Sequence, residues 1–311
     1  YLLTYLDDEK ILLSYTKSLR NTLTDEYFGA VSTIKPSLLE QQKIAAFLDG
    51  KVAHINNIIE DTKKSIENLK AYKQSFITET VTKGLDSNVE MKDSGIEWIR
   101  KIPKHWKVSK LKYIKDNEKY AIVDGPFGSD MKVNDYISTG IPITQLNNIS
   151  PMKQELKNLK FVSDEKAESL KRHQIFPNDL LVAKMMPAGR TCIVSNEYEK
   201  YMLSSDSIRV KVDSEMANSI YVAYHLNALN THQAEMYSKG TTRIRINLGI
   251  VNNYFVLLPP LEEQNLIAEY LNNSVMELDK ILRDKEQLII DLESYKKSLI
   301  YEYVTGKKEV K

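Results

Sequence analysis

One long stretch of the sequence occurs twice. Pro36–Thr82 and Pro259–Thr305 align without a gap at an offset of 223 residues, which is 259 − 36. Identical pairs include Leu38/Leu261, Glu40/Glu263, Gln41/Gln264, Ile44/Ile267, Ile66/Ile289, Tyr72/Tyr295 and Val81/Val304. Both copies keep an apolar helical period without an internal proline, so each is predicted to be one long helix. Solenoid repeats have periods of about 20–50 residues. This repeat is therefore a duplicated module with a whole domain between its copies.

An apolar stripe runs along each predicted helix in alternating steps of four and three residues, the heptad pattern of a coiled-coil seam. In the first copy the seam is Leu48, Val52, Ile55, Ile59, Thr62, Ile66, Leu69, Lys73 and Phe76. In the second copy it is Leu271, Val275, Leu278, Leu282, Lys285, Ile289, Leu292, Lys296 and Leu299. Each helix would extend roughly 65–70 Å. Such a stripe needs a partner, and the obvious partner is the other copy.

The position of the intervening domain predicts the direction of this pairing. The two ends of a compact domain usually lie close together. Parallel helices would hold Gly84 and Pro259 a helix length apart, whereas antiparallel helices place them side by side. We therefore predict an α+β fold, with a mixed α/β domain and an antiparallel coiled coil. A second domain, represented by residues 1–35, would lie at the other end to complete a pseudo-twofold dumbbell.

The chain divides into five predicted parts. Residues 1–35 realign weakly with the end of the middle domain (Tyr1, Leu3, Leu6 and Arg20 with Tyr224, Leu226, Leu229 and Arg243) and are predicted to be the C-terminal remnant of a first such domain. The other parts are the first long helix (36–84), a connector (85–106), the middle domain (107–258), and the second long helix with its tail (259–311). In the middle domain, strands are predicted at 121–123, 180–183, 192–194, 208–212 and 254–258, and helices at 164–171 and 216–236.

Composition and charge exclude several classes of protein. An apolar content of 42% and a charged content of 27% are those of a soluble globular protein. No apolar run is long enough to span a membrane. The single cysteine, Cys192, excludes a disulfide framework and fits the reducing cytoplasm. Residues 107–258 carry 20 Lys/Arg against 16 Asp/Glu, a net charge of +4, while residues 259–306 carry 5 against 10, a net of −5. The middle domain is thus the part expected to meet a polyanion.

Motifs for catalysis are absent from the sequence. It contains no phosphate loop of the GxxxxGK[ST] type and no HExxH, GxSxG or CxxC pattern. Its five histidines are scattered, and surface or core positions explain them better than chemistry. We therefore predict a binding protein without catalytic residues, bound metal or cofactor.

The first stretch that could contact nucleic acid is Asp124–Lys132, which reads D-G-P-F-G-S-D-M-K. Its glycines allow a close approach of the backbone, and its hydroxyl and ammonium groups can donate to phosphates or bases. An ordinary tight turn would use the same residues. The candidate contacts here are Gly125, Phe127, Gly128, Ser129 and Lys132.

The second stretch is K-G-T-T-R-I-R, residues 239–245. If it is extended, Arg243 and Arg245 share one face. Arginine forks suit guanine edges and phosphates, although a solvated edge strand remains the alternative. Its candidate contacts are Lys239, Thr241, Thr242, Arg243 and Arg245. A weaker third candidate is the pair Lys184 and Arg190, which flank Met185–Gly189.

These features together resemble the DNA-specificity (S) subunits of type I restriction–modification systems. The resemblance rests on the repeated P-x-L-x-E-Q-x-x-I helix start (Pro36–Ile44 and Pro259–Ile267) and on I-P-K-H-W-K-V-x-K-L-K (Ile102–Lys112). The D-G-P-F-G-S loop, the G-T-T-R segment and L-P-P-L-E-E-Q extend it over nearly the whole chain. In that family two target-recognition domains each read half of a split DNA site, and conserved helices between them pair antiparallel. By this resemblance the sequence is expected to carry one complete recognition domain and only the end of a first one.

The resemblance implies particular partners. The long helices would dock methylation (M) subunits, two per complex, which hold S-adenosylmethionine and the catalytic motif. Restriction (R) subunits would join to cleave DNA, and double-stranded DNA is the target. The chain itself would neither methylate nor cleave. The alternative is a coiled-coil scaffold whose middle domain binds protein and does not read DNA.

Overall fold

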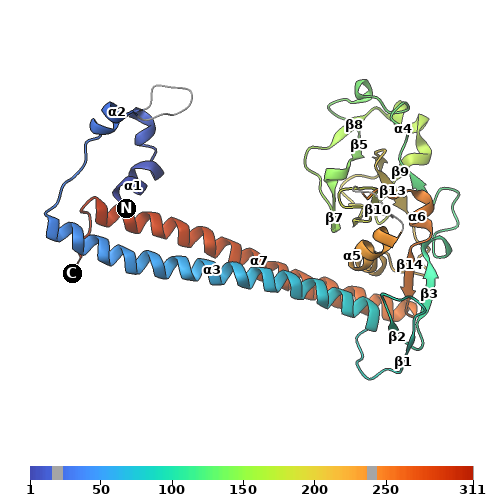
Figure 1. Ribbon diagram of the computed structural model, residues 1–311. Coiled ribbons are helices and arrows are strands. Elements are labelled where there is room, and N and C mark those ends of the chain that lie inside the picture. Colours follow the sequence, from blue (N-terminus) through green and yellow to red (C-terminus); the bar gives the residue numbers. More distant parts are fainter. Residues whose placement is uncertain (16–23, 237–243, 311) are drawn as a thin grey trace. The chain divides into compact units, whose positions relative to one another are not determined.

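The computed structural model describes residues 1–15, 24–236 and 244–310. The chain forms two compact units, unit 1 (Tyr1–Tyr72 with Met276–Lys311) and unit 2 (Lys73–Val275). The α-helices are α1 (Leu2–Asp8), α2 (Asp25–Gly29), α3 (Leu38–Lys83), α4 (Asp164–Ser169), α5 (Ser219–Met236), α6 (Leu248–Asn252) and α7 (Leu261–Val304) (Figure 1). Among the described residues no helix is both long and apolar enough to cross a membrane.

The two long helices pair antiparallel, as the sequence predicts. In unit 1, Leu48 of α3 packs in one cluster with Leu299 of α7. Lys296 donates to Asn56 at 3.0 Å, and Lys70 pairs with Glu286 at 3.4 Å. Because the partner's number falls as the number on α3 rises, the helices run in opposite directions. In unit 2 the same pairing brings the rings of Phe76 and Tyr270 to 5.6 Å.

Every position of the predicted seam is buried or half-buried. The polar interruptions are accommodated locally. The Thr62 hydroxyl donates to the Ile58 carbonyl of its own helix at 2.7 Å. Lys73, Lys285 and Lys296 are half-buried, because the methylene groups of long cationic side chains can cover apolar surface.

The seam predicts a difference between two leucines on α7. Leu292 is half-buried in the unit 1 cluster, whereas Leu288 is 44% exposed. Leu292→Ala should lower the free energy of unfolding by about 1–2 kcal/mol, because it removes most of a half-buried apolar side chain. Leu288→Ala should change it by less than about 0.5 kcal/mol. Chemical denaturation of both variants measures this, and equal losses would contradict the seam.

Unit 2 contains a six-stranded sheet in the order β4-β13-β10-β11-β7-β6. Its strands are β4 (Ile122–Asp124), β6 (Ile149–Ser150), β7 (Met152–Gln154), β10 (Leu180–Ala183), β11 (Thr191–Ile193) and β13 (Ser207–Val210). β10 pairs antiparallel with both β13 and β11, with Leu181 opposite Arg209 and Cys192. The only parallel pair in this sheet joins β11 and β7 within the described residues.

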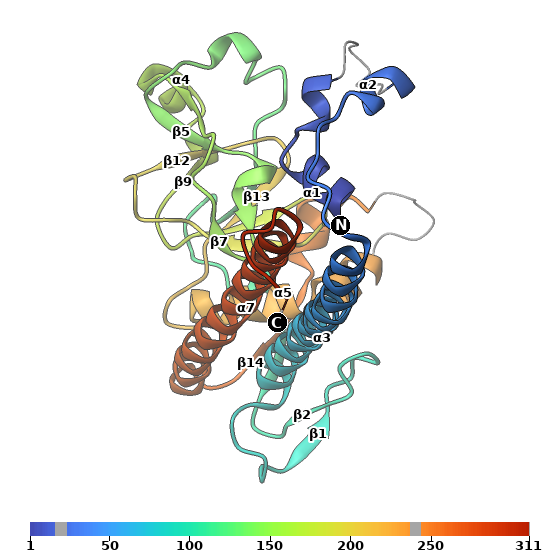
Figure 2. The same cartoon turned by 90° about the vertical axis from the view of Figure 1, so that its left-hand side faces the viewer.

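A four-stranded sheet, β8-β5-β12-β9, packs against the first (Figure 2). Its strands are β5 (Ile141–Thr144), β8 (Lys160–Val162), β9 (Gln174–Ile175) and β12 (Tyr201–Leu203). Leu181 and Ala183 of β10 face Tyr201 and Leu203 in the cluster between the sheets, while Leu180 and Val182 face the main core. Both faces of β10 are therefore buried, which explains its unbroken apolar run.

The main core of unit 2 lies between the six-stranded sheet, α5 and the ends of α3 and α7 that belong to this unit. Asn218 caps α5 by accepting from the backbone N–H groups of Ile220 and Tyr221. The predicted helix at 216–236 therefore begins only at Ser219, and the one at 164–171 is α4, capped by Ser163. Small sheets complete the unit: β1 (Met91–Asp93) with β2 (Lys101–Pro103), and β3 (Lys107–Lys110) with β14 (Phe255–Leu258).

The five predicted strands are β4, β10, β11, β13 and β14, each shifted by no more than two residues at either end. Within the described residues there are nine further strands that the sequence did not predict, because most are two or three residues long and show no period. Cys192 is fully buried between the two sheets, and burial raises the pKa of its thiol to about 12. It is a small core residue.

Several contacts repeat at the offset of the sequence duplication. The Tyr1 hydroxyl donates to Asp49 at 2.7 Å, and the Tyr224 hydroxyl to Asn272 at 3.0 Å. The Gln41 amide donates to the Pro36 carbonyl and the Gln264 amide to the Pro259 carbonyl. Helices α2 and α6 also lie 223 residues apart. These contacts therefore repeat with the sequence, while the assignment of residues 1–35 as the remnant of a first domain stays a prediction.

Candidate functional site

The loops of unit 2 enclose a cavity of about 350 Å³. It is lined by Pro126, Phe127, Gly128, Met131, Tyr136, Gln145, Leu146, Asn147, Ser204, Ser205 and Asp206. A larger cavity of about 700 Å³ lies beside β7. The D-G-P-F-G-S loop lines the smaller cavity, and Lys184, Arg190 and Arg245 contact residues of its lining. Its walls offer amide, hydroxyl and carboxylate groups beside an aromatic ring.

The D-G-P-F-G-S loop forms one wall of this cavity. Gly125 lies so close to the backbone that follows β12 that a Cβ atom there would be 1.8 Å from the Ser204 carbonyl oxygen. Only glycine fits, which is the reason for that residue in the motif. The loop then turns outward, and the Phe127 side chain is 79% exposed at its tip. A Cβ at Gly128 would meet nothing within 4 Å.

Lys184 anchors the base of the loop. Its ammonium group is buried and donates to the Ser205 carbonyl at 2.7 Å and to the Asp124 carboxylate at 3.4 Å. Nδ1 of His173 lies 2.7 Å from the Asp124 carbonyl, so Nδ1–H donates to it, and burial lowers the pKa of this histidine. Lys184 therefore links the start of the D-G-P-F-G-S loop to Ser205, which lines the cavity.

Each of the two arginines contacts a residue that lines this cavity. Arg190 is half-buried and donates to the Leu146 carbonyl at 2.8 Å. Arg245 is exposed and pairs with Asp206 at 2.8 Å. The backbone N–H of Ile246 donates to the Lys184 carbonyl, which fixes residues 244–246 beside the cavity. The fold thus joins three stretches that are far apart in the sequence.

The remaining predicted contacts divide into two groups. Ser129 and Lys132 are exposed on the loop; the Ser129 hydroxyl donates to Asp130, and the backbone of Lys132 donates to Asp135. Lys239, Thr241, Thr242 and Arg243 lie outside the described residues. Their assignment to DNA contact stays a prediction, as does that of the other candidates.

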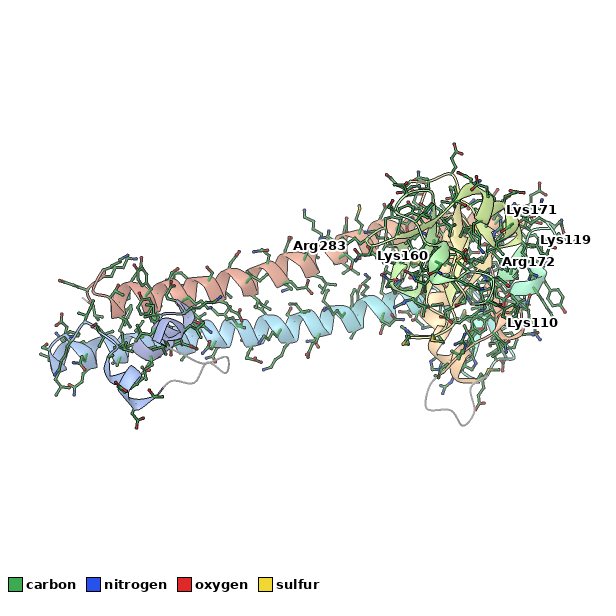
Figure 3. All side chains as sticks on the ribbon, turned by 90° about the horizontal axis from the view of Figure 1, so that it is seen from above. Lys110, Lys119, Lys160, Lys171, Arg172 and Arg283 are labelled. Atoms are coloured by element: carbon green, nitrogen blue, oxygen red, sulfur yellow. The ribbon has the colours of Figure 1, made fainter. Side chains whose placement is uncertain are left out.

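A cluster of cationic side chains lies beside this loop. It was not predicted from the sequence. The Lys119 ammonium lies 5.3 Å and the Arg172 guanidinium carbon 5.5 Å from the centre of the Tyr120 ring. Arg172 precedes His173, which binds the loop at Asp124. Figure 3 shows Lys119, Lys171 and Arg172 on the same side of unit 2. The interleaving of basic and aromatic residues at 119–120 and 171–173 was the available sequence signal.

The arrangement is suited to binding a polyanion and reading its polar edges. Exposed cations beside a tyrosine ring can hold phosphates. Glutamine and asparagine side chains such as Gln145 and Asn147 can pair with base edges. The described residues contain no cluster of histidine, cysteine, aspartate and glutamate that could hold a metal ion.

Residues 103–289, more than half of the chain, match the sequence profile of the type I restriction modification DNA specificity domain. The chain belongs to this family. Two similar proteins are the type I restriction enzyme MjaX and MjaVIII specificity subunits of Methanocaldococcus jannaschii. The MjaX subunit is 29% identical over 89% of this chain and 59% of its own length. The MjaVIII subunit is 25% identical over 97% of this chain and 68% of its own length. The EcoBI specificity subunit of Escherichia coli is 23% identical, over 87% of this chain and 57% of its own.

Two solved structures share this fold. One, from a study of assembly and conformational transition of the type I R-M system, covers 99% of this chain and 71% of its own, with a TM-score of 0.75 at 17% identity. The alignment with the HsdS subunit from Thermoanaerobacter tengcongensis covers 99% of this chain and 70% of that subunit, with a TM-score of 0.58 at 17% identity. The chain spans about three fifths of the length of the MjaX relative.

Proposed function

We propose that the chain is a DNA-recognition component of a type I restriction–modification complex and that unit 2 reads one half of a bipartite DNA site. The observation that carries this proposal is one polar cavity that the D-G-P-F-G-S loop lines and whose lining residues Leu146 and Asp206 contact Arg190 and Arg245. That cavity lies in the segment matched by the specificity-domain profile. Catalysis would reside in partner subunits, with S-adenosylmethionine bound to the methylation subunit.

The long helices supply surface for those partners. Several large apolar side chains of α7 in unit 1 are more than two fifths exposed: Met276, Ile281, Leu288, Ile290 and Tyr295. An extended set of exposed apolar side chains is typical of a protein-interaction surface. The helix pair would therefore dock methylation subunits while unit 2 contacts DNA, and restriction subunits would join the complex to cleave.

A domain exchange tests this division of roles. Residues 107–258 would be replaced by the corresponding segment of a relative, and the hybrid expressed with the methylation subunits of its system. We expect one half of the methylated sequence to change and the other half to persist, because the exchanged segment makes the base contacts. Methylome sequencing measures both halves.

The unexchanged chain in the same cells is the control. An unchanged methylated sequence would show that residues 107–258 do not read DNA. A hybrid complex that assembles but binds all duplexes equally would favour the scaffold alternative instead.

A further inference from the structure

Two cations share one exposed aromatic ring on unit 2, in a group that we call the Tyr120 cluster (Lys119, Tyr120 and Arg172). The Lys119 ammonium lies 5.3 Å and the Arg172 guanidinium carbon 5.5 Å from the centre of the Tyr120 ring. All three residues are exposed. Two positive charges held against one ring repel each other, and an anion that both can reach relieves the repulsion.

The glutamates that flank the cluster in the sequence are already paired with other cations. Glu118 contacts Arg209 at 2.7 Å and Lys211 at 2.9 Å. Glu168 pairs with Lys171 at 3.3 Å. Among the described residues neither cation of the cluster has a carboxylate at ion-pair distance. The cluster therefore presents uncompensated positive charge to the solvent.

The segment 116–121, which carries the lysine and the tyrosine, is fixed at both ends. Its first N–H donates to the Lys211 carbonyl at 2.9 Å, and its last carbonyl accepts from the Lys211 N–H at 2.7 Å. Between these ends, Glu118 pairs with Arg209, which is 4% exposed and also donates to Asp179 at 2.7 Å. Donors held in place in this way lose little conformational freedom when they bind a ligand.

The third member of the cluster is joined to the D-G-P-F-G-S loop through its neighbour. His173 is buried, and its Nδ1–H donates to the carbonyl of Asp124, where that loop begins. The short helix Lys171–His173 thus carries one exposed cation of the cluster and one anchor of the loop. An anion bound at the cluster would therefore be fixed in position relative to the loop.

We infer that the Tyr120 cluster binds a phosphate of the DNA backbone, beside the base pairs that the D-G-P-F-G-S loop contacts. The inference rests on the proposed DNA recognition by unit 2 and gives the cluster a separate role. Phosphate contacts fix the register of a protein on the duplex and carry no sequence information. The cluster therefore adds affinity on every duplex, whereas the cavity discriminates among sequences.

The test measures the DNA affinity of the complex assembled with its methylation subunits, between about 50 and 200 mM salt. The double variant Lys119→Gln/Arg172→Gln removes both charges at exposed positions. We expect affinity to fall about tenfold, for the methylated sequence and for a scrambled duplex alike. The slope of log affinity against log salt concentration should become shallower by about one. Arg172→Lys keeps the charge and should keep the slope. Fluorescence anisotropy measures all of these quantities.

The matched control is Lys157→Gln/Lys160→Gln, which removes two charges from the same unit. Both lysines are exposed, and Figure 3 shows Lys160 on the opposite side of unit 2 from Arg172. Its affinity and slope should stay those of the parent. An equal change in this control would overturn the inference, because net charge and not the cluster would then be responsible.

The remaining outcomes separate this inference from the proposed function. Parental affinity and slope in the cluster variant, with a parent that binds duplex DNA, would overturn the inference alone. A parent without salt-dependent duplex binding would overturn it together with the proposed function. A loss on the methylated sequence only would make the cluster a base-reading element instead. Failure of the cluster variant to assemble, seen by size-exclusion chromatography, would assign the cluster to a protein contact and overturn the inference as well.

Discussion

Replacing Gly125 by alanine is expected to weaken DNA binding by the assembled complex about a hundredfold, a loss of roughly 2.7 kcal/mol. The new Cβ would lie 1.8 Å from the Ser204 carbonyl oxygen and 2.4 Å from its carbon. Both are backbone atoms, so no side-chain rotation relieves the clash. The loop or Ser204 must move, and both line the cavity. Binding groups displaced by about 1 Å lose productive geometry.

The control for this prediction is Gly29→Ala at the end of α2, outside the cavity lining. A Cβ there meets nothing within 4 Å, so affinity should stay within about twofold, or 0.4 kcal/mol. Fluorescence anisotropy with a duplex carrying the methylated sequence measures both variants, and thermal unfolding shows whether Gly125→Ala acts locally. Parental affinity in a folded Gly125→Ala complex would separate this loop from DNA recognition.

The second large effect is an acid-dependent loss of stability at His225. The imidazole is fully buried in unit 2, and its Nε2 accepts from the Leu257 N–H at 3.1 Å. Nδ1 makes no hydrogen bond within the described residues. Burial lowers the pKa of His225 to about 3 from a usual value of 6.5. The folded protein therefore holds this ring neutral where the unfolded chain would bind a proton.

The sign of the effect follows from that depressed pKa. The stability contribution of the neutral ring is complete above pH 6.5 and is lost as the pH falls towards 3. At pH 4 the loss from this group is about 3 kcal/mol, at 1.36 kcal/mol per pH unit. His225→Gln keeps an acceptor for the Leu257 N–H and cannot titrate. Its free energy of unfolding should therefore fall less steeply below pH 6.5 than that of the parent. Parallel curves from denaturation at pH 4 to 8 would contradict the assignment.

The sequence alone determined the features that repeat over many residues. The heptad steps from Leu48 to Phe76 and from Leu271 to Leu299 predicted both helices and their seam, because a long helix averages over local exceptions. The antiparallel direction followed from the position of one domain between two copies. Family membership followed from motifs such as I-P-K-H-W and D-G-P-F-G-S.

Only the tertiary structure decided how the candidate site is assembled. Strands as short as β6 and β9 have no period to read, since their pairing partners lie far away in the sequence. Lys184 looked like a surface contact, but its ammonium is buried and ties Asp124 to Ser205. The basic residues at 119 and 171–172 are visible in the sequence, but only the fold brings Arg172 beside Tyr120. Which charges are buried and which face solvent depends on packing between distant segments, and that packing is set by the whole fold.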